Sequence, residues 1–78
     1  MKTRFKDQFY HVFMKVMGTT TVDENWSMNS IAEWDSLKHI QLIAELEDEL
    51  NIQFDYEDIV TMNSIAKIDE VLCKYEVF

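Results

Sequence analysis

The residues of this chain whose types and spacing best suit chemistry are Asp35, Ser36 and Leu37, which stand directly before an amphipathic stretch that ends at Leu50. The first turn of a helix has backbone N–H groups without partners and a partial positive charge, so it stabilises an anion. Asp35 is a residue type that commonly caps a helix N-terminus. Ser36 then falls in the first turn, where a solvent-exposed hydroxyl is well placed to carry a phosphodiester.

The length and composition predict one small all-α domain over residues 1–78. A chain of this size is near the lower limit for a core without a disulfide or metal. Nearly half of the residues are apolar, and one Gly with no Pro disfavours disorder and favours helices. We expect a small four-helix bundle of three longer helices and one short third helix. Apolar spacing places the helices at about 3–17, 36–50, 56–60 and 64–75.

Helix ends and loops follow from local residue types. Gly18 is the only glycine and is expected to end the first helix. Asp55 is expected to cap the third helix, and Asn63 or Ser64 to open the fourth. The long loop from Thr19 to Glu33 lacks sustained periodicity, and such loops are usually functional or packed by their own side chains. Four scattered apolar residues are expected to pin it onto the bundle: Val22, Trp26, Met28 and Ile31.

The second predicted helix has two distinct faces. Its polar residues gather within roughly 100° of the helix circumference; they are Lys38, Gln41, Glu45, Asp48 and Glu49. The apolar arc is wide, which predicts burial against more than one neighbour; its members are Leu37, Ile40, Ile43, Ala44, Leu46 and Leu50. A charged stripe is normally a solvated face. The place of this stripe directly below Ser36 instead favours a role in binding a partner.

Charge is segregated along the chain. Residues 33–58 hold nine carboxylates and one base, Lys38, a net of −8, whereas the first seventeen residues hold four bases and one acid, a net of +3. We therefore expect a strongly negative side formed by the second and third helices. Such acidity argues against nucleic acid and anionic membranes as partners and favours basic protein surfaces. Acidity that serves solubility alone is the alternative explanation.

Other reactive residue types predict no second site. The single cysteine, Cys73, excludes an internal disulfide and a Cys-based zinc site, and we expect it to be a small packing residue. His11 and His39 lack ligand-like spacing and are expected to be surface or boundary residues, with no metal site and no catalytic set. Gln8 and Lys15 help to interrupt the apolar stretch that a signal peptide requires. We expect a soluble, cytoplasmic protein without a membrane-inserted segment.

Taken together, these features resemble the acyl carrier protein family. The resemblance covers the whole chain and is sharpest between about residues 31 and 72. It is carried by Trp34-Asp35-Ser36-Leu37, Glu45-Leu46-Glu47-Asp48-Glu49-Leu50, Asn51-Ile52-Gln53-Phe54 and Ser64-Ile65-Ala66-Lys67-Ile68. A lone Asp-Ser-Leu is a weak signal, but an acidic amphipathic helix directly behind it makes the motif far more specific.

The resemblance implies a function and a set of partners. A phosphopantetheinyl transferase would move 4′-phosphopantetheine from coenzyme A to Ser36, and the thiol of the arm would carry acyl or aminoacyl groups as thioesters. The domain itself would catalyse nothing and would act as a monomer. Asp35 would be recognised by the transferase, and Leu37 would contact the modification site or lie in the core. The polar stripe would meet the basic patches of loading and acyltransfer enzymes; its residues are Glu45, Asp48 and Glu49, flanked by Lys38 and Gln41.

Departures from the family pattern point away from housekeeping fatty-acid synthesis. Glu33 and Trp34 precede the triplet where small residues are usual, Lys38 and His39 follow it, and Gln53-Phe54 replaces the familiar proline before the third helix. In these features the chain looks more like carriers of specialised pathways, such as polyketide, nonribosomal peptide, lipid or cell-surface glycan assembly. Trp34 is expected either to pack the loop or to contact the arm or a partner, with loop packing preferred. The alternative function is an acidic helical interaction module that docks to a basic partner without modification.

Overall fold

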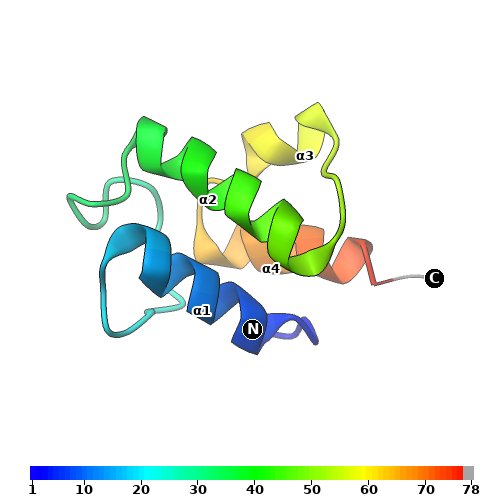
Figure 1. The fold of residues 1–78 in the computed structure, drawn as a ribbon, viewed down its shortest axis with the longest axis horizontal. Helices are drawn as coiled ribbons and strands as arrows, with labels where there is room; N and C mark the ends of the chain where they lie inside the picture. Colours follow the sequence, from blue (N-terminus) through cyan, green and yellow to red (C-terminus); the bar gives the residue numbers. More distant parts are fainter. Residues whose placement is uncertain (77–78) are drawn as a thin grey trace.

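A computed structural model describes residues 1–76 as four helices joined by loops (Figure 1). The helices are α1 (Lys6–Met17), α2 (Ser36–Leu50), α3 (Tyr56–Thr61) and α4 (Ile65–Lys74). α1 and α2 run roughly antiparallel, and α4 lies behind α2 in the view of Figure 1. The predicted all-α fold with three longer helices, a short third helix and a long first loop is confirmed.

The first helix begins at Lys6, later than the predicted start near residue 3. The backbone N–H groups of Lys2 and Thr3 both donate to the carboxylate of Asp69 in α4, at 2.9–3.0 Å. These bonds hold the preceding segment against α4 and so prevent it from extending the helix. The other end is where the sequence places it: Gly18 adopts a left-handed conformation, with φ of 73°, and its N–H donates to the Met14 carbonyl.

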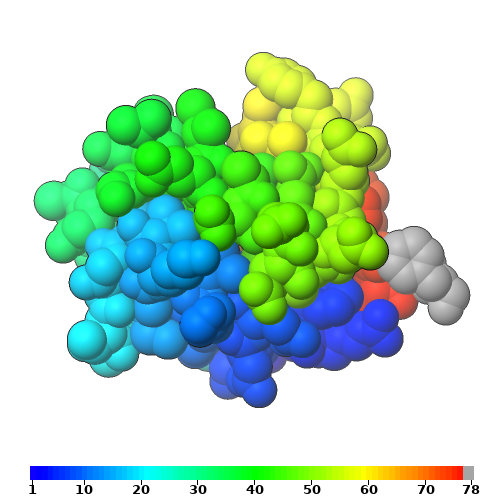
Figure 2. Space-filling model, in the orientation of Figure 1, coloured from blue at the N-terminus to red at the C-terminus, as the bar shows by residue number. Residues whose placement is uncertain are grey.

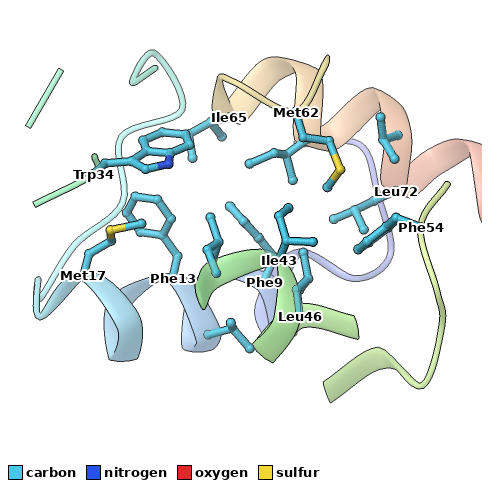
Figure 3. Close-up of a cluster of buried hydrophobic side chains, with 14 residues drawn as sticks. Phe9, Phe13, Met17, Trp34, Ile43, Leu46, Phe54, Met62, Ile65 and Leu72 are labelled. Carbon is cyan, nitrogen blue, oxygen red and sulfur yellow. The ribbon is translucent and has the colours of Figure 1, made fainter. Parts of the chain in front are cut away.

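The core is built from all parts of the bundle (Figure 3). α1 contributes Phe9 and Phe13, α2 contributes Leu46, and α4 contributes Ile65 and Leu72. The remaining buried apolar side chains are Val12, Met17, Trp34, Leu42, Ile43, Phe54, Met62, Ile68 and Val71. Burial of these side chains is the main stabilising contribution to so small a fold.

The long loop is fixed to the start of α4 by backbone hydrogen bonds. The N–H of Met28 donates to the Asn63 carbonyl, and the N–H of Ile65 donates to the Trp26 carbonyl, both at 2.9 Å. The four predicted anchor residues of the loop pack against the core as partly buried side chains: Val22, Trp26, Met28 and Ile31. The loop is therefore an ordered part of the domain, and it delivers the chain to the start of α2 in a defined position.

The predicted burial of α2 is wrong along one edge of its apolar arc. Leu42, Ile43 and Leu46 are buried, but Leu37 and Ile40 are 65% and 67% exposed. α3 is only six residues long, and nothing in the described structure covers these two side chains. α2 thus packs on one side only, and its opposite edge presents apolar surface to solvent.

The longest helix, α2, has 15 residues, which corresponds to roughly 22 Å at the usual rise per residue. A bilayer core is about 30 Å thick. Within residues 1–76, no helix combines the length and apolar character needed to cross a membrane.

Candidate functional site

The candidate site begins with Ser36, which is the first residue of α2 and is exposed. Asp35 adopts an extended conformation directly before it, and its Oδ1 accepts a hydrogen bond from the backbone N–H of Lys38 at 2.9 Å. This bond satisfies one of the free N–H groups of the first turn. The Ser36 hydroxyl is therefore presented to solvent at the positive end of a capped helix.

The side chains directly below Ser36 on α2 are not those of the acidic stripe. Residues four, seven and eleven positions after Ser36 share its side of the helix. They are Ile40, Ile43 and Glu47, and all three line a groove between α2 and α3. The prediction that the acidic stripe lies directly below Ser36 is therefore wrong, because that stripe lies about half a turn around the helix.

The groove between α2 and α3 has a volume of about 220 Å³. Figure 2 shows it as a notch between the green surface of α2 and the yellow surface of α3. Its walls are largely apolar, with one imidazole and one carboxylate as polar groups; the lining residues are His39, Ile40, Ile43, Ala44, Glu47 and Ile59. A groove of this kind suits a narrow ligand that is mostly apolar and carries a few polar groups.

Exposed large apolar side chains gather on the helices that form this groove. Leu37 and Ile40 of α2 are joined by Tyr56 and Val60 of α3, which are 74% and 56% exposed. We use the name α2–α3 apolar patch for this set of four exposed side chains on the two helices. Leu37 is thus not a core residue. Of the two roles expected from the sequence, only a contact at the modification site remains as a prediction. Tyr56 and Val60 lie four residues apart and so share one face of α3; this spacing was available in the sequence as a signal for the patch.

Trp34 packs the loop and is fully buried. Its indole ring meets Phe13 edge-on, with centroids 5.2 Å apart, and its Nε1–H donates to Nδ1 of His39 at 3.1 Å. The preferred interpretation of Trp34 as a packing residue is therefore correct, and its buried indole does not present a surface to an arm or a partner. Burial lowers the pKa of His39 below its ordinary value of 6.5, and the polar backbone of Ile59 acts in the opposite direction.

The predicted polar stripe lies over the junction of α2 with α1. Glu45 forms an ion pair with Lys15 of α1 at 3.1 Å, and the Lys38 ammonium donates to the Val16 carbonyl at 3.2 Å. Gln41 lines a shallow groove between α1 and α2, together with Lys15, Lys38 and Glu45. Both partners of the ion pair are substantially exposed, so the pair contributes little to stability.

The last two members of the stripe, Asp48 and Glu49, are exposed near the end of α2. They lie three turns along the helix from Ser36. The structure therefore does not bring the predicted partner-binding carboxylates onto the side of α2 that Ser36 occupies.

The remaining reactive residues do not form a second site. In the described part of the chain, no three side chains of His, Cys, Asp or Glu are grouped so that they could hold a metal ion. Burial and the nearby carboxylates of Asp69 and Glu76 raise the pKa of Cys73, which disfavours the thiolate needed for nucleophilic chemistry. His11 is exposed on α1.

No known protein family, no curated protein and no solved structure matches this chain.

Proposed function

We propose that the chain is a carrier protein whose Ser36 bears 4′-phosphopantetheine. The observation that carries the proposal is the exposed Ser36 hydroxyl at the capped start of α2, on the side of the helix that leads into the α2–α3 groove. In the reaction, Ser36 Oγ forms a bond to the phosphorus next to pantetheine in coenzyme A. The hydroxyl proton is lost, and adenosine 3′,5′-bisphosphate leaves.

The residues around Ser36 fit such a group. A phosphodiester adds negative charge at a helix start, where the helix dipole stabilises it. The arm has a short apolar portion, which matches the apolar walls of the groove at Ile40, Ile43 and Ile59. It also has two amides, for which the groove offers the polar side chains of His39 and Glu47. When attached, the arm supplies the thiol that holds cargo as a thioester. The protein supplies an exposed attachment point and a binding surface.

The α2–α3 apolar patch supports a role in binding successive partner enzymes. Leu37 and Ile40 flank Ser36, so an enzyme that reaches the serine or its arm must also contact them. Exposed carboxylates near the patch, including Asp55 directly before α3 and Glu57 within α3, favour partners whose apolar contact is rimmed by Arg or Lys. Asp48 and Glu49 add long-range attraction that speeds association and weakens with salt.

The test of the attachment site is the intact mass of the protein. The purified chain is incubated with coenzyme A, Mg²⁺ and a broad-specificity phosphopantetheinyl transferase. We expect a gain of one phosphopantetheine, abolished in Ser36→Ala and unchanged in Ser30→Ala, which removes another exposed serine from the loop before α2. No gain of mass, or equal modification of the Ser36→Ala variant, would refute the proposal.

The departures from the family pattern bear on the kind of pathway and not on the cargo. We infer a specialised biosynthetic pathway, such as polyketide, nonribosomal peptide, lipid or cell-surface glycan assembly, because large residues surround the Asp-Ser-Leu triplet. The intact mass of protein purified from its native source tests this inference. A thioester-linked adduct other than a simple fatty acyl chain would support it, and the mixture of fatty acyl chains carried in housekeeping fatty-acid synthesis would contradict it.

A second candidate function is an acidic helical interaction module that binds a basic partner without modification. The α2–α3 apolar patch favours it, since the patch needs no phosphopantetheine to make contacts. Native protein that is wholly unmodified and held in a stable complex, together with unchanged binding by Ser36→Ala, would support this candidate over the carrier.

A further inference from the structure

The solvent-facing side of α2 is one row of exposed side chains. At about 100° per residue, its five members fall within roughly 100° of the helix circumference; they are Leu37, Ile40, Gln41, Ala44 and Asp48. We call this row the α2 crest. Figure 2 shows the green surface of α2 between the blue surface of α1 and the yellow surface of α3. The crest is the part of α2 that both neighbouring helices leave uncovered.

Ala44 is a low point of the crest. It lines both hollows beside α2, namely the α2–α3 groove, of about 220 Å³, and the shallow groove between α1 and α2, of about 410 Å³. Its methyl group lets another backbone come close, and the two hollows leave room for side chains on either side. Leu37, Ile40 and Ala44 are separated by three and four residues, the spacing with which one helix packs along another. The shape of the crest therefore suits a helix.

The first two turns of the crest carry no charge. The Lys38 ammonium donates to a backbone carbonyl of α1, and Glu45 pairs with Lys15 of α1, so both charged side chains belong to the α1 side of the helix. The first charged member of the crest is Asp48. The crest is thus apolar at the end next to Ser36 and negative at the opposite end.

This polarity disfavours a second copy of the chain as the occupant near neutral pH. An antiparallel two-fold pairing would bring the apolar end of each crest against the acidic end of the other. A parallel pairing would place the carboxylates of both copies side by side, and each copy carries a net charge of −8. The complementary occupant has cations where the crest has carboxylates, which excludes anionic membranes and nucleic acids as well.

We propose that the α2 crest binds one amphipathic helix of a partner protein. Apolar residues of that helix cover Leu37 and Ile40, and Lys or Arg side chains lie at its end that meets Asp48. Tyr56 and Val60 of α3 extend the apolar contact across the α2–α3 groove. The inference rests on the proposed function in taking the surface beside Ser36 as the partner-binding surface, but it does not require Ser36 to be modified.

The two ends of the crest have separate effects on binding. Burial of Leu37 and Ile40 supplies most of the affinity, because desolvated apolar side chains at the centre of a contact contribute most. Asp48 supplies attraction that speeds association and that salt screens. A partner held by the acidic stripe alone would instead be released at high salt.

The test is an NMR titration of the unmodified chain with three synthetic helical peptides of about four turns, or roughly 14 residues. The first has Leu side chains on one face over two turns and Lys and Arg on the same face over the next two. The second has the same composition in scrambled order, and the third replaces each Lys and Arg by Glu. We expect the first peptide to shift the amides of the crest and of α3, and to bind at least about tenfold more tightly than the other two.

Substitutions on the crest locate the contact. Ile40→Ala and Leu37→Ala should each weaken binding of the first peptide by about tenfold, whereas Val22→Ala, in the loop outside the crest, should not change it. Asp48→Asn should weaken binding by only about threefold and should reduce its dependence on salt. Circular dichroism confirms that each variant is folded.

Four results would overturn the inference. They are equal binding of the scrambled peptide, no shift of crest amides with the first peptide, loss of binding in Asp48→Asn with none in Ile40→Ala, and a dimer formed through the crest at neutral pH, seen by light scattering.

Ser36→Ala distinguishes this inference from the carrier proposal. It should bind the first peptide as the wild type does. Peptide binding without modification by coenzyme A would refute the carrier and leave the helix-binding crest, and normal modification without crest binding would do the reverse.

Discussion

The Asp58 carboxylate of α3 accepts hydrogen bonds from the ammonium of Lys74 at the end of α4, at 2.9 Å to Oδ1 and 3.0 Å to Oδ2. The hydroxyl of Tyr75 donates to the same carboxylate at 2.7 Å and accepts from the Asp55 N–H at 2.9 Å. Asp58 is one of two buried polar residues among residues 1–76, and its partners all lie at the junction of the two helices. These hydrogen bonds connect the short α3 to the end of α4.

Asp58→Asn should lower the free energy of unfolding by about 1–3 kcal/mol, because it removes the acceptor charge and leaves partly buried donors without it. Urea denaturation followed by circular dichroism measures the change. The control is Asp48→Asn, an exposed carboxylate on α2, which should alter the free energy of unfolding by less than about 0.5 kcal/mol. Equal effects of the two substitutions would contradict a structural role of the network.

The same network predicts a pH dependence of stability in acid. Hydrogen bonds from Lys74 and Tyr75 lower the pKa of Asp58 below its ordinary value of 3.8. The stabilisation is therefore complete above pH 3.8 and is lost as the pH falls through the lower pKa of the folded protein. The difference in free energy of unfolding between wild type and Asp58→Asn should shrink over that range. A difference that stays constant into strong acid would show that the charge of Asp58 does not matter.

Shortening a side chain should lower the free energy of unfolding much more on the buried edge of α2 than on its exposed edge. Leu42 is fully buried, so Leu42→Ala should cost about 2–5 kcal/mol of unfolding free energy. Ile40→Ala removes a side chain that is mostly exposed and should cost less than about 0.5 kcal/mol. Thermal or urea denaturation checks both. A large loss of stability in Ile40→Ala would mean that something covers this edge of the helix.

The same pair of positions also predicts an effect on function. If the α2–α3 apolar patch contacts the transferase, Ile40→Ala or Leu37→Ala should slow the modification of Ser36 by about tenfold while stability is kept. The rate is followed by intact mass under limiting transferase. Val22→Ala serves as the control, since it alters an apolar residue of the loop outside the patch. Unchanged rates for both patch variants would exclude the patch from this contact.

Asp35 is predicted to have two separable roles. Asp35→Ala removes the side-chain cap of α2 and should cost about 1 kcal/mol, whereas Asp35→Asn keeps an acceptor for the Lys38 N–H and should cost far less. If the transferase recognises the carboxylate, both variants should be modified slowly. Normal modification of Asp35→Asn would leave capping as the only role of Asp35.

Sequence patterns predicted where each helix begins and ends better than they predicted which helix faces are covered by other parts of the protein. Gly18 and Asp35 fix helix ends through local backbone chemistry, which sequence reveals directly. The exposure of Ile40 depends on how far α3 extends over α2, and that is a property of the assembled bundle. Helical periodicity reports which residues share a side, not whether a neighbour covers it.

The contacts of His39 illustrate the same limit. Its type and position suggested only a boundary residue, and the half-buried ring does lie at the surface of the bundle. The acceptor role toward Trp34 arises because the loop turns back and brings the indole against the first turn of α2. The Asp58 network likewise joins residues 16 and 17 positions apart in sequence, for which no local pattern exists.

The α2–α3 apolar patch should also affect how the protein behaves in concentrated solution. At neutral pH, mutual repulsion between molecules of charge −8 keeps their uncovered leucine and isoleucine side chains apart. Near the isoelectric point of about 4.5 that repulsion disappears, and molecules should self-associate through Leu37 and Ile40. Acid titrations that cross this range therefore call for dilute samples, and replacing these two residues should raise the solubility limit there.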